Sequence, residues 1–198
     1  MRALGAIIAG GQGRRFGGDK AAALFRGKPL IDHVAEALAR QVADLVVVGR
    51  AWTGLPFLAD RPQGALGPLA GLNAALHHAR AYGYDGVISA GCDTLPILPD
   101  MASLLAGGGP AYLDDHFLLG WWPSALSPDL ERHLAEQDDR SIRGWIKRCR
   151  ARPVPRRIDQ RERDPDLLGA QRPFARLERG NGCRRHLVGR VRHLVPMQ

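Results

Sequence analysis

The sequence predicts an α/β protein in three layers, in which a mostly parallel, twisted sheet carries helices on both faces, as in Rossmann-like folds. Short apolar runs alternate with segments of helical period, a pattern typical of a parallel sheet. A glycine-rich loop follows the first apolar run, and acidic residues follow two later runs, where sites of such sheets usually lie. The chain has 198 residues, a length that suits a domain with a sizeable core.

The expected elements follow one another along the first 160 residues. The first strand is the apolar run at residues 3–9, which glycines end. The first helix runs from about Pro29, a residue favoured in the first helical turn, to Gln41. Further strands are predicted at residues 45–48, 56–59, 86–90, 111–113, 117–122 and 154–158. Further helices are predicted at residues 69–82, 100–105, 126–134 and 142–149.

The composition argues against several classes of protein. Hydrophobic residues make up 45% of the chain, which is too many for a disordered protein. No run reaches the roughly 18 apolar residues of a membrane span, and the N-terminus lacks the layout of a signal peptide. We therefore expect a cytoplasmic protein that does not bind a membrane. The scattered cysteines, which favour neither a zinc site nor a disulfide framework, are Cys92, Cys149 and Cys183.

The charge is distributed unevenly along the chain. Residues 1–139 hold 11 Lys and Arg against 15 Asp and Glu, whereas residues 140–198 hold 17 against 5. The basic third could bind nucleic acid, an acidic ligand or an acidic partner, or its arginines could be solvated. It lacks an RNA-binding signature, so nucleic acid is not an expected partner. We expect one domain over residues 1–160 and a basic segment over residues 161–198, either packed on the domain or partly disordered.

A glycine-rich loop follows the first strand. Its five glycines fall within nine residues, from Gly10 to Gly18. Glycine leaves no side chain between the backbone and a ligand, and successive N–H groups in such a loop can bind an anion. Arg14, Arg15 and Lys20 add positive charge that suits phosphate oxygens. The loop predicts a site for a di- or triphosphate, and the alternative is an ordinary turn with solvated arginines.

Two aspartates follow predicted strands. Asp93 comes after the strand at residues 86–90, where a carboxylate is well placed to hold Mg²⁺ through oxygen. Asp60 follows the strand at residues 56–59, at the same edge of the expected sheet. Each aspartate could instead cap or open a turn. Cys92, beside Asp93, is expected to be a small buried residue rather than a nucleophile.

Three segments resemble those of one enzyme family. The nucleotidyltransferase signature L-A-G-G-x-x-x-R-M-G-x-D-K is resembled by Ile8-Ala9-Gly10-Gly11, Arg15-Phe16-Gly17 and Asp19-Lys20, with Phe16 in place of the usual Met. A second family segment opens on an Asp, here Asp60, and its G-P-L-A-G run is matched by Gly67-Pro68-Leu69-Ala70-Gly71. The metal-binding segment C-D-T-P is matched by Cys92-Asp93-Thr94, with Leu95 inserted before Pro96. On these motifs the chain resembles the molybdenum cofactor guanylyltransferases over about residues 3–160.

Two further segments show the resemblance, and three positions depart from it. The run from His116 to Pro123 is similar to the family strand H-P-L-x-G-L-W-P, with Phe117 in place of the first proline. The run from Arg140 to Trp145 is similar to the helix R-S-V-R-x-W, which in the family lies near the acceptor. Asparagines usual in the family are replaced here by Gly49, Gly169 and Gln171.

The resemblance implies a Rossmann-like nucleotidyltransferase fold and a Mg²⁺-dependent transfer of GMP from GTP to molybdenum-bound molybdopterin. The products would be the molybdopterin guanine dinucleotide cofactor and pyrophosphate. It implies catalytic roles for Lys20, Arg15 and Asp93, with the metal at Asp93. Nucleotide binding is implied for Ile8, Ala9, Gly10, Gly11, Arg14, Lys20, Asp60, Gly67 and Asp93. GTP and molybdopterin are the expected ligands, and acceptor molybdoenzymes or their chaperones are candidate protein partners.

Two alternatives stay open. The same fold can host another nucleotidyltransferase, with a cytidine nucleotide or a sugar phosphate as its substrate. A module without catalytic activity that binds a nucleotide or nucleic acid could also carry a glycine loop and a basic segment.

Overall fold

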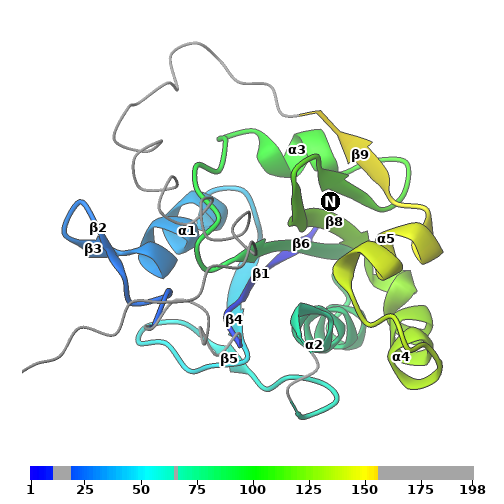
Figure 1. Cartoon of the computed structure of the whole chain (residues 1–198). Coiled ribbons are helices and arrows are strands. Elements are labelled where there is room, and N and C mark those ends of the chain that lie inside the picture. The colour runs from blue at the N-terminus through cyan, green and yellow to red at the C-terminus, as the bar shows by residue number, and fades with distance from the viewer. Residues whose placement is uncertain (11–18, 65–66, 156–198) are drawn as a thin grey trace, which may run out of the picture. The chain divides into compact units, whose positions relative to one another are not determined.

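The computed structural model of the chain describes residues 1–10, 19–64 and 67–155. In this part of the chain, the central sheet has seven strands in the order β5-β4-β1-β6-β8-β7-β9 (Figure 1). They are β1 (Ala3–Ile8), β4 (Asp44–Val48), β5 (Phe57–Leu58), β6 (Gly86–Gly91), β7 (Ala111–Leu113), β8 (His116–Pro123) and β9 (Arg152–Val154). Helices cover both faces, so the predicted three-layer α/β fold is confirmed.

The half of the sheet formed by β5, β4, β1 and β6 is parallel. Its register places Ile8 beside Val48 on one side and beside Gly91 on the other, while Val48 lies beside Leu58. Strands β1 and β6 are buried at every position, as expected of central parallel strands. The carboxyl ends of these strands therefore meet at one edge of the sheet.

The other half of the sheet changes direction. Strand β8 pairs antiparallel with β6, with Ser89 opposite Gly120, and β7 pairs antiparallel with β8. Because β8 runs against β6, its first residue, His116, lies toward the edge where β6 ends. Strand β9 pairs parallel with β7 at the border of the sheet. The start of β8 thus reaches the edge at which the parallel strands end.

Two helical layers enclose the sheet (Figure 1). Side chains of successive strand residues point to opposite faces, so Ile7 packs in the cluster of Ile31 and Ile8 in the cluster of Leu72. One layer contains α1 (Leu30–Ala39) and α3 (Met101–Leu105), and the other contains α2 (Pro68–Ala81), α4 (Ser127–Glu136) and α5 (Ile142–Cys149). A short 3₁₀ helix, Ser124–Leu126, leads into α4. None of the helices in the described ranges is long and apolar enough to span a bilayer.

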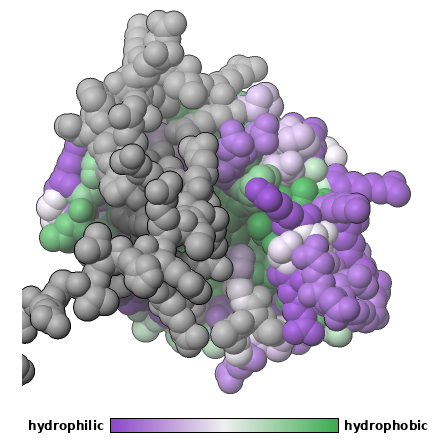
Figure 2. All heavy atoms as spheres, viewed as in Figure 1, coloured by the Kyte–Doolittle hydropathy of each residue, from purple (hydrophilic) through white to green (hydrophobic). Residues whose placement is uncertain are grey.

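Helices α4 and α5 are amphipathic. Their inner sides contribute Leu130, Leu134 and Trp145 to the core, next to the fully buried Trp122. Their outer sides are hydrophilic, as Figure 2 shows for the same view. The division follows from the helical period of the apolar positions, which is why the sequence predicts α5 with the bounds that the structure gives it.

A hairpin between the glycine loop and α1 is absent from the sequence-based prediction. Strands β2 (Leu24–Phe25) and β3 (Lys28–Pro29) pair antiparallel around Arg26 and Gly27, which both have positive φ. A two-residue turn of this kind fits the twist of a hairpin. Because Pro29 belongs to the hairpin, α1 starts one residue later than the predicted helix, at Leu30.

The last strand also begins earlier than predicted. Strand β9 starts at Arg152, whereas the sequence predicts a strand at residues 154–158. From residue 156 on, that prediction lies outside the described residues. The predicted division into residues 1–160 and 161–198 also falls there and stays a prediction.

The hydroxyl of Ser89 gives a test of how the two halves of the sheet are joined. It donates to Leu118 O (2.5 Å) and accepts from Trp122 Nε1 (2.8 Å), and Ser89 and Trp122 are both fully buried. Ser89→Ala should leave the indole N–H without a partner and lower the free energy of unfolding by about 1–3 kcal/mol. Urea unfolding measures this loss of free energy. An unchanged midpoint would mean that the hydroxyl does not stabilise the contact between β6 and β8.

Ser103→Ala is the matched control. The Ser103 hydroxyl also donates to a backbone oxygen, at Asp100, but lies exposed on α3. Its removal should change the free energy of unfolding by less than about 0.5 kcal/mol.

Candidate functional site

The ends of β1, β4 and β5 meet in a tight turn region that glycines make possible. Ala9 N donates to Val48 O (2.9 Å), and Gly49 N donates to Leu58 O (3.0 Å). A Cβ atom added at Gly49 would lie 2.5 Å from the Cα of Gly10, which is closer than real Cβ contacts. The φ of Gly49 is also positive, at +86°. Both the space and the backbone therefore require glycine at this position.

Asp60 occupies the small space beside these glycines. A Cβ at Gly10 would lie 2.8 Å from Asp60 Oδ2, and Cβ atoms at Gly49 and Gly71 would lie 3.1 Å and 3.3 Å from Oδ1. The carboxylate therefore fits against backbone from β1, from β4 and from the first turn of α2. Sequence reasoning placed Asp60 at this edge, and the structure brings it together with Gly10.

The Asp60 carboxylate is half-buried, and the described residues give it no hydrogen-bond or ion-pair partner. Burial raises the pKa of this carboxyl above its ordinary value, because the charged form loses water. A half-buried carboxylate without a partner is costly to the free protein. It is, however, available to accept hydrogen bonds from a ligand that carries two donors.

Lys20 and Asp93 lie together at the same edge. Lys20 Nζ lies 3.4 Å from Asp93 Oδ2, in a pair that is partly exposed. A turn just after β6 holds Asp93, because Gly91 N donates to Thr94 Oγ1 (2.9 Å) and Thr94 N donates to Gly91 O (3.1 Å). The structure thus joins the Asp-Lys end of the glycine-loop motif to the Cys-Asp-Thr motif, 73 positions away.

Arg50 is a residue of this edge that sequence reasoning did not single out. Its guanidinium donates to both oxygens of Asp19, over 2.5 Å and 2.7 Å. The hydrogen bonds from Arg50 lower the pKa of the Asp19 carboxyl, and the pair raises the pKa of Arg50. A basic residue two positions beyond a predicted parallel strand, after a glycine, is the signal that could have marked Arg50 as part of the site.

Cys92 lies next to Asp93 but is not suited to nucleophilic chemistry. Burial, and then the Asp93 charge, raise the pKa of its thiol to about 11. A thiol with that pKa stays protonated near neutral pH. The expectation of a small, unreactive buried residue agrees with this environment.

The other predicted site residues fall into two groups. Ile8 ends β1, Ala9 and Gly10 follow it, and Gly67 stands just before α2 with a φ of +74°. The predicted residues outside the described ranges are Gly11, Arg14 and Arg15. Within the described ranges no three His, Cys, Asp or Glu side chains gather as a metal cage. Asp93 offers one carboxylate, and a magnesium ion commonly completes its coordination with water and substrate phosphates.

The segment expected near the acceptor, from Arg140 to Trp145, contacts the β8 segment that also resembles the family. The guanidinium of Arg143, in α5, lies 4.5 Å from the ring centroid of Phe117, in β8, and Tyr112 lies 5.7 Å from Phe117. Ser141 caps α5, because its hydroxyl accepts from Gly144 N at 3.0 Å. This basic and aromatic surface belongs to the start of β8, on the side of the sheet where β6 ends.

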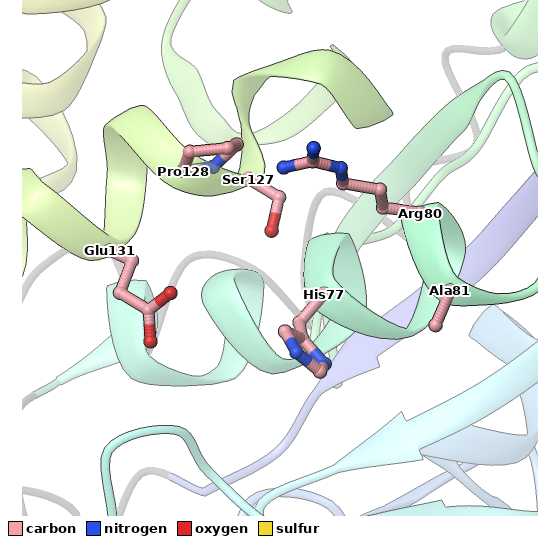
Figure 3. A pocket seen from close by; sticks show the side chains of 6 residues that line it. All are labelled: His77, Arg80, Ala81, Ser127, Pro128 and Glu131. Carbon is pink, nitrogen blue, oxygen red and sulfur yellow. The ribbon is translucent and has the colours of Figure 1, made fainter.

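A groove between α2 and α4 lies elsewhere on the molecule (Figure 3). His77, Arg80 and Ala81 line it from the last turns of α2, at the opposite end of that helix from Gly67. Ser127, Pro128 and Glu131 line it from the start of α4. The groove thus uses none of the residues predicted to bind nucleotide.

The fold and this edge of the sheet together define a class of protein, the nucleotidyltransferases, in which charge beside a backbone loop meets the phosphates and a separate group meets the base. Residues 5–153 match the family model described as a MobA-like NTP transferase domain. The chain belongs to this family, as the resemblance of its motifs predicts.

Named relatives and solved structures agree with this assignment. The chain is 40% identical over 154 residues to a molybdenum cofactor guanylyltransferase of Rhodobacter capsulatus, which covers 72% of this chain and 80% of the relative. It is 41% identical over 164 residues to one from Cereibacter sphaeroides, covering 75% and 82%. The solved molybdopterin-guanine dinucleotide biosynthesis protein A from Archaeoglobus fulgidus has a TM-score of 0.66 at 24% identity, covering 87% of this chain and 99% of that one.

The unpaired carboxylate of Asp60 leads to a prediction about stability. Its folded-state pKa is raised, so the free energy of unfolding falls as the pH rises through that pKa and stays lower above it. Asp60→Asn removes the charge and keeps the shape, and should raise the Tm at pH 7 by about 1–3 °C. The gain should shrink as the pH is lowered through the raised pKa of Asp60, because the native carboxyl is then protonated and neutral.

Asp138→Asn, at an exposed carboxyl, is the control for this measurement and should leave the Tm nearly unchanged. A lower Tm for Asp60→Asn at pH 7 would mean that the carboxylate stabilises the free protein, against the environment described above.

Proposed function

We propose that the protein is a Mg²⁺-dependent guanylyltransferase, which transfers GMP from GTP to the terminal phosphate of molybdenum-bound molybdopterin and releases pyrophosphate. The observation that carries the proposal is the Asp60 carboxylate, which lies in a space lined by glycines and has no partner among the described residues. Guanine offers two donors on one edge, and adenine and cytosine do not offer that pair. The names of the relatives that match over most of the chain support the same substrate and product.

The phosphates would lie next to Lys20 and Asp93. An oxygen of the acceptor phosphate attacks the α-phosphorus of GTP, a new P–O bond forms there, and the bond to pyrophosphate breaks in line with it. Catalysis of this kind depends mostly on positioning and on neutralising negative charge. Lys20 would stabilise the negative charge on the departing pyrophosphate, and the attacking phosphate is already ionised near neutral pH.

The residues present fit a magnesium ion. Mg²⁺ binds through one or two carboxylates together with substrate phosphates and water, and Asp93 offers one carboxylate at the end of β6. When bound, the ion would supply positive charge to the phosphate oxygens. Lys20, at 3.4 Å from Asp93, would then share these phosphates with the ion rather than hold Asp93 alone.

The acceptor would approach from the side of β8 and α5. Arg143 offers a positive charge beside the exposed part of Phe117, which suits a ligand with a planar ring and a phosphate. Acceptor molybdoenzymes or their chaperones are the protein partners that fit this product. The cytoplasm remains the expected location.

The choice of base can be tested at Gly10. Wild type should prefer GTP over CTP and ATP by at least ~100-fold in kcat/KM, a ratio that hydrogen-bonding sites can reach. In Gly10→Ala the new Cβ would lie 2.8 Å from Asp60 Oδ2 and displace the carboxylate. The preference should then fall, mainly because GTP is used less well. Competition assays with the three nucleotides measure it.

The competing explanation is that the backbone needs glycine at position 10 for a positive φ. In that case Gly10→Ala would weaken the use of every nucleotide alike. The φ of Gly10 does not lie in that region, so the loss should be selective for GTP. A uniform loss would contradict the role of Asp60 in reading the base. A wild type that prefers CTP would overturn the guanylyl assignment in favour of a cytidylyltransferase.

The metal role of Asp93 has its own test. Asp93→Asn removes the anionic oxygen and keeps the shape of the side chain. Turnover should fall about 100-fold or more, the scale for loss of one important electrostatic group, while circular dichroism stays unchanged. Calorimetric binding of Mg²⁺ in the presence of GTP should weaken in parallel. Near-normal turnover and Mg²⁺ binding would remove Asp93 from the metal site.

A further inference from the structure

Arg50 forms a bidentate ion pair that joins two segments of the site. Its two terminal nitrogens donate to the two oxygens of Asp19, 31 positions earlier in the chain. Two parallel hydrogen bonds fix orientation as well as distance. Asp19 directly precedes Lys20, so a contact that fixes Asp19 also restricts where the next side chain can point.

Arg50 is itself held in place. The turn at Gly49 is fixed by its contact with Gly10, and it delivers Arg50 directly after β4. Two residues further on, Trp52 Nε1 donates to Asp32 Oδ1 in α1, over 2.6 Å. The guanidinium of Arg50 also lies 5.4 Å from the ring centroid of Trp52. The segment that carries Arg50 is therefore anchored on both sides.

The segment that carries Lys20 is anchored next to α1. Ala21 N donates to Asp19 Oδ1 over 3.1 Å, so the same carboxylate that binds Arg50 also closes the turn around Lys20. Ile31 N donates to Ala21 O (3.3 Å) and connects this turn to α1. Lys20 is thus the residue between a carboxylate fixed by Arg50 and a backbone fixed by α1.

Both ion pairs lie at the edge where the parallel strands end. Lys20 pairs with Asp93 just after β6, and its neighbour Asp19 pairs with Arg50 just beyond β4. Lys20 and Asp93 are 25% and 38% exposed, and Arg50 and Asp19 are 32% and 44% exposed. Ion pairs as exposed as these typically contribute about 0–1 kcal/mol to stability. The stability of the fold therefore does not by itself explain the bidentate Arg50–Asp19 pair.

We propose that Arg50 is a positioning residue for the phosphate site: through Asp19 it holds Lys20 where its ammonium meets the outer phosphates beside Asp93. It also neutralises Asp19, whose charge would otherwise repel a polyphosphate. The inference rests on the proposed role of Lys20 at the phosphates and adds a residue that none of the matched motifs contains. Arg50 acts on the phosphates through Lys20, not by contact.

Two other roles for Arg50 make different predictions. If Arg50 touched the phosphates itself, its loss would weaken binding whether or not Lys20 is present. If Arg50 served only stability, its loss would lower the Tm and leave phosphate binding unchanged. A positioning role predicts that the effects of losing Arg50 and losing Lys20 are not additive, because each removes the same interaction.

The test is a double-mutant cycle measured by calorimetry, with magnesium pyrophosphate and magnesium GTP as ligands. Arg50→Ala should weaken both ligands about 10-fold in the wild-type background. In the Lys20→Ala background the same change should cost less than ~2-fold. GMP, which lacks the outer phosphates, should bind all four proteins with similar affinity. An equal loss in both backgrounds would overturn the proposal, as would no loss in either.

Conservative and control variants complete the design. Arg50→Lys keeps the positive charge but loses the planar guanidinium. It should therefore recover less than half of the binding free energy that Arg50→Ala loses. Full recovery would mean that Arg50 contributes only its charge, and would overturn the proposed positioning role. Arg132→Ala breaks a more exposed arginine–aspartate pair, on α4, and should leave pyrophosphate binding unchanged. If Arg50→Ala does not fold, Asp19→Asn tests the same contact from its other side.

Pyrophosphate carries no base, so the cycle separates this inference from the guanylyl assignment. A wild type that binds pyrophosphate but does not prefer GTP would contradict the base assignment while the cycle still decides the role of Arg50. A wild type without measurable affinity for either ligand would overturn the inference.

Discussion

The close approach of the backbone at Gly10 and Gly49 is the constraint on which the rest of this edge depends. No side chain fits at Gly49, where a Cβ would lie 2.5 Å from the Cα of Gly10 and φ is +86°. The contact lets β1 and β4 end side by side, and the space that remains admits the carboxylate of Asp60. The space that we propose for base recognition and the Arg50 contact both depend on the absence of these two side chains.

Two aspartates of this edge show how the same residue acquires opposite properties from its surroundings. Arg50 and the backbone of Ala21 satisfy Asp19 and lower the pKa of its carboxyl, so it stays charged and fixed. Asp60 is half-buried and has no partner in the part of the chain that the structure describes, and burial raises the pKa of its carboxyl. The surroundings of Asp19 suit a structural contact, and those of Asp60 suit a carboxylate that accepts hydrogen bonds from a ligand.

The sequence predicts the parallel sheet and the convergence of Gly10, Asp60 and Asp93, because short apolar runs end where these residues stand and parallel strands share an edge. The sequence did not predict the β2–β3 hairpin. Its strands have only two residues each, and the Arg26-Gly27 turn is the one local signal for it. The sequence did not predict the contact of Arg50 with Asp19, because the two residues are 31 positions apart. Pairing across such a distance depends on strand order, which no local pattern in the sequence encodes.

The replacement of the family's usual Asn by Gly49 gains a physical meaning from this geometry. An Asn there would need its Cβ within the space of the Gly10 backbone, so the ends of β1 and β4 would have to separate. With glycine they stay close, and the next side chain in the turn after β4, that of Arg50, contacts Asp19. On the proposed function, β4 then serves the phosphates through Lys20, while β5 serves the base through Asp60. On this proposal, glycine at position 49 allows β4 to contribute to phosphate binding while the neighbouring β5 contributes to base binding.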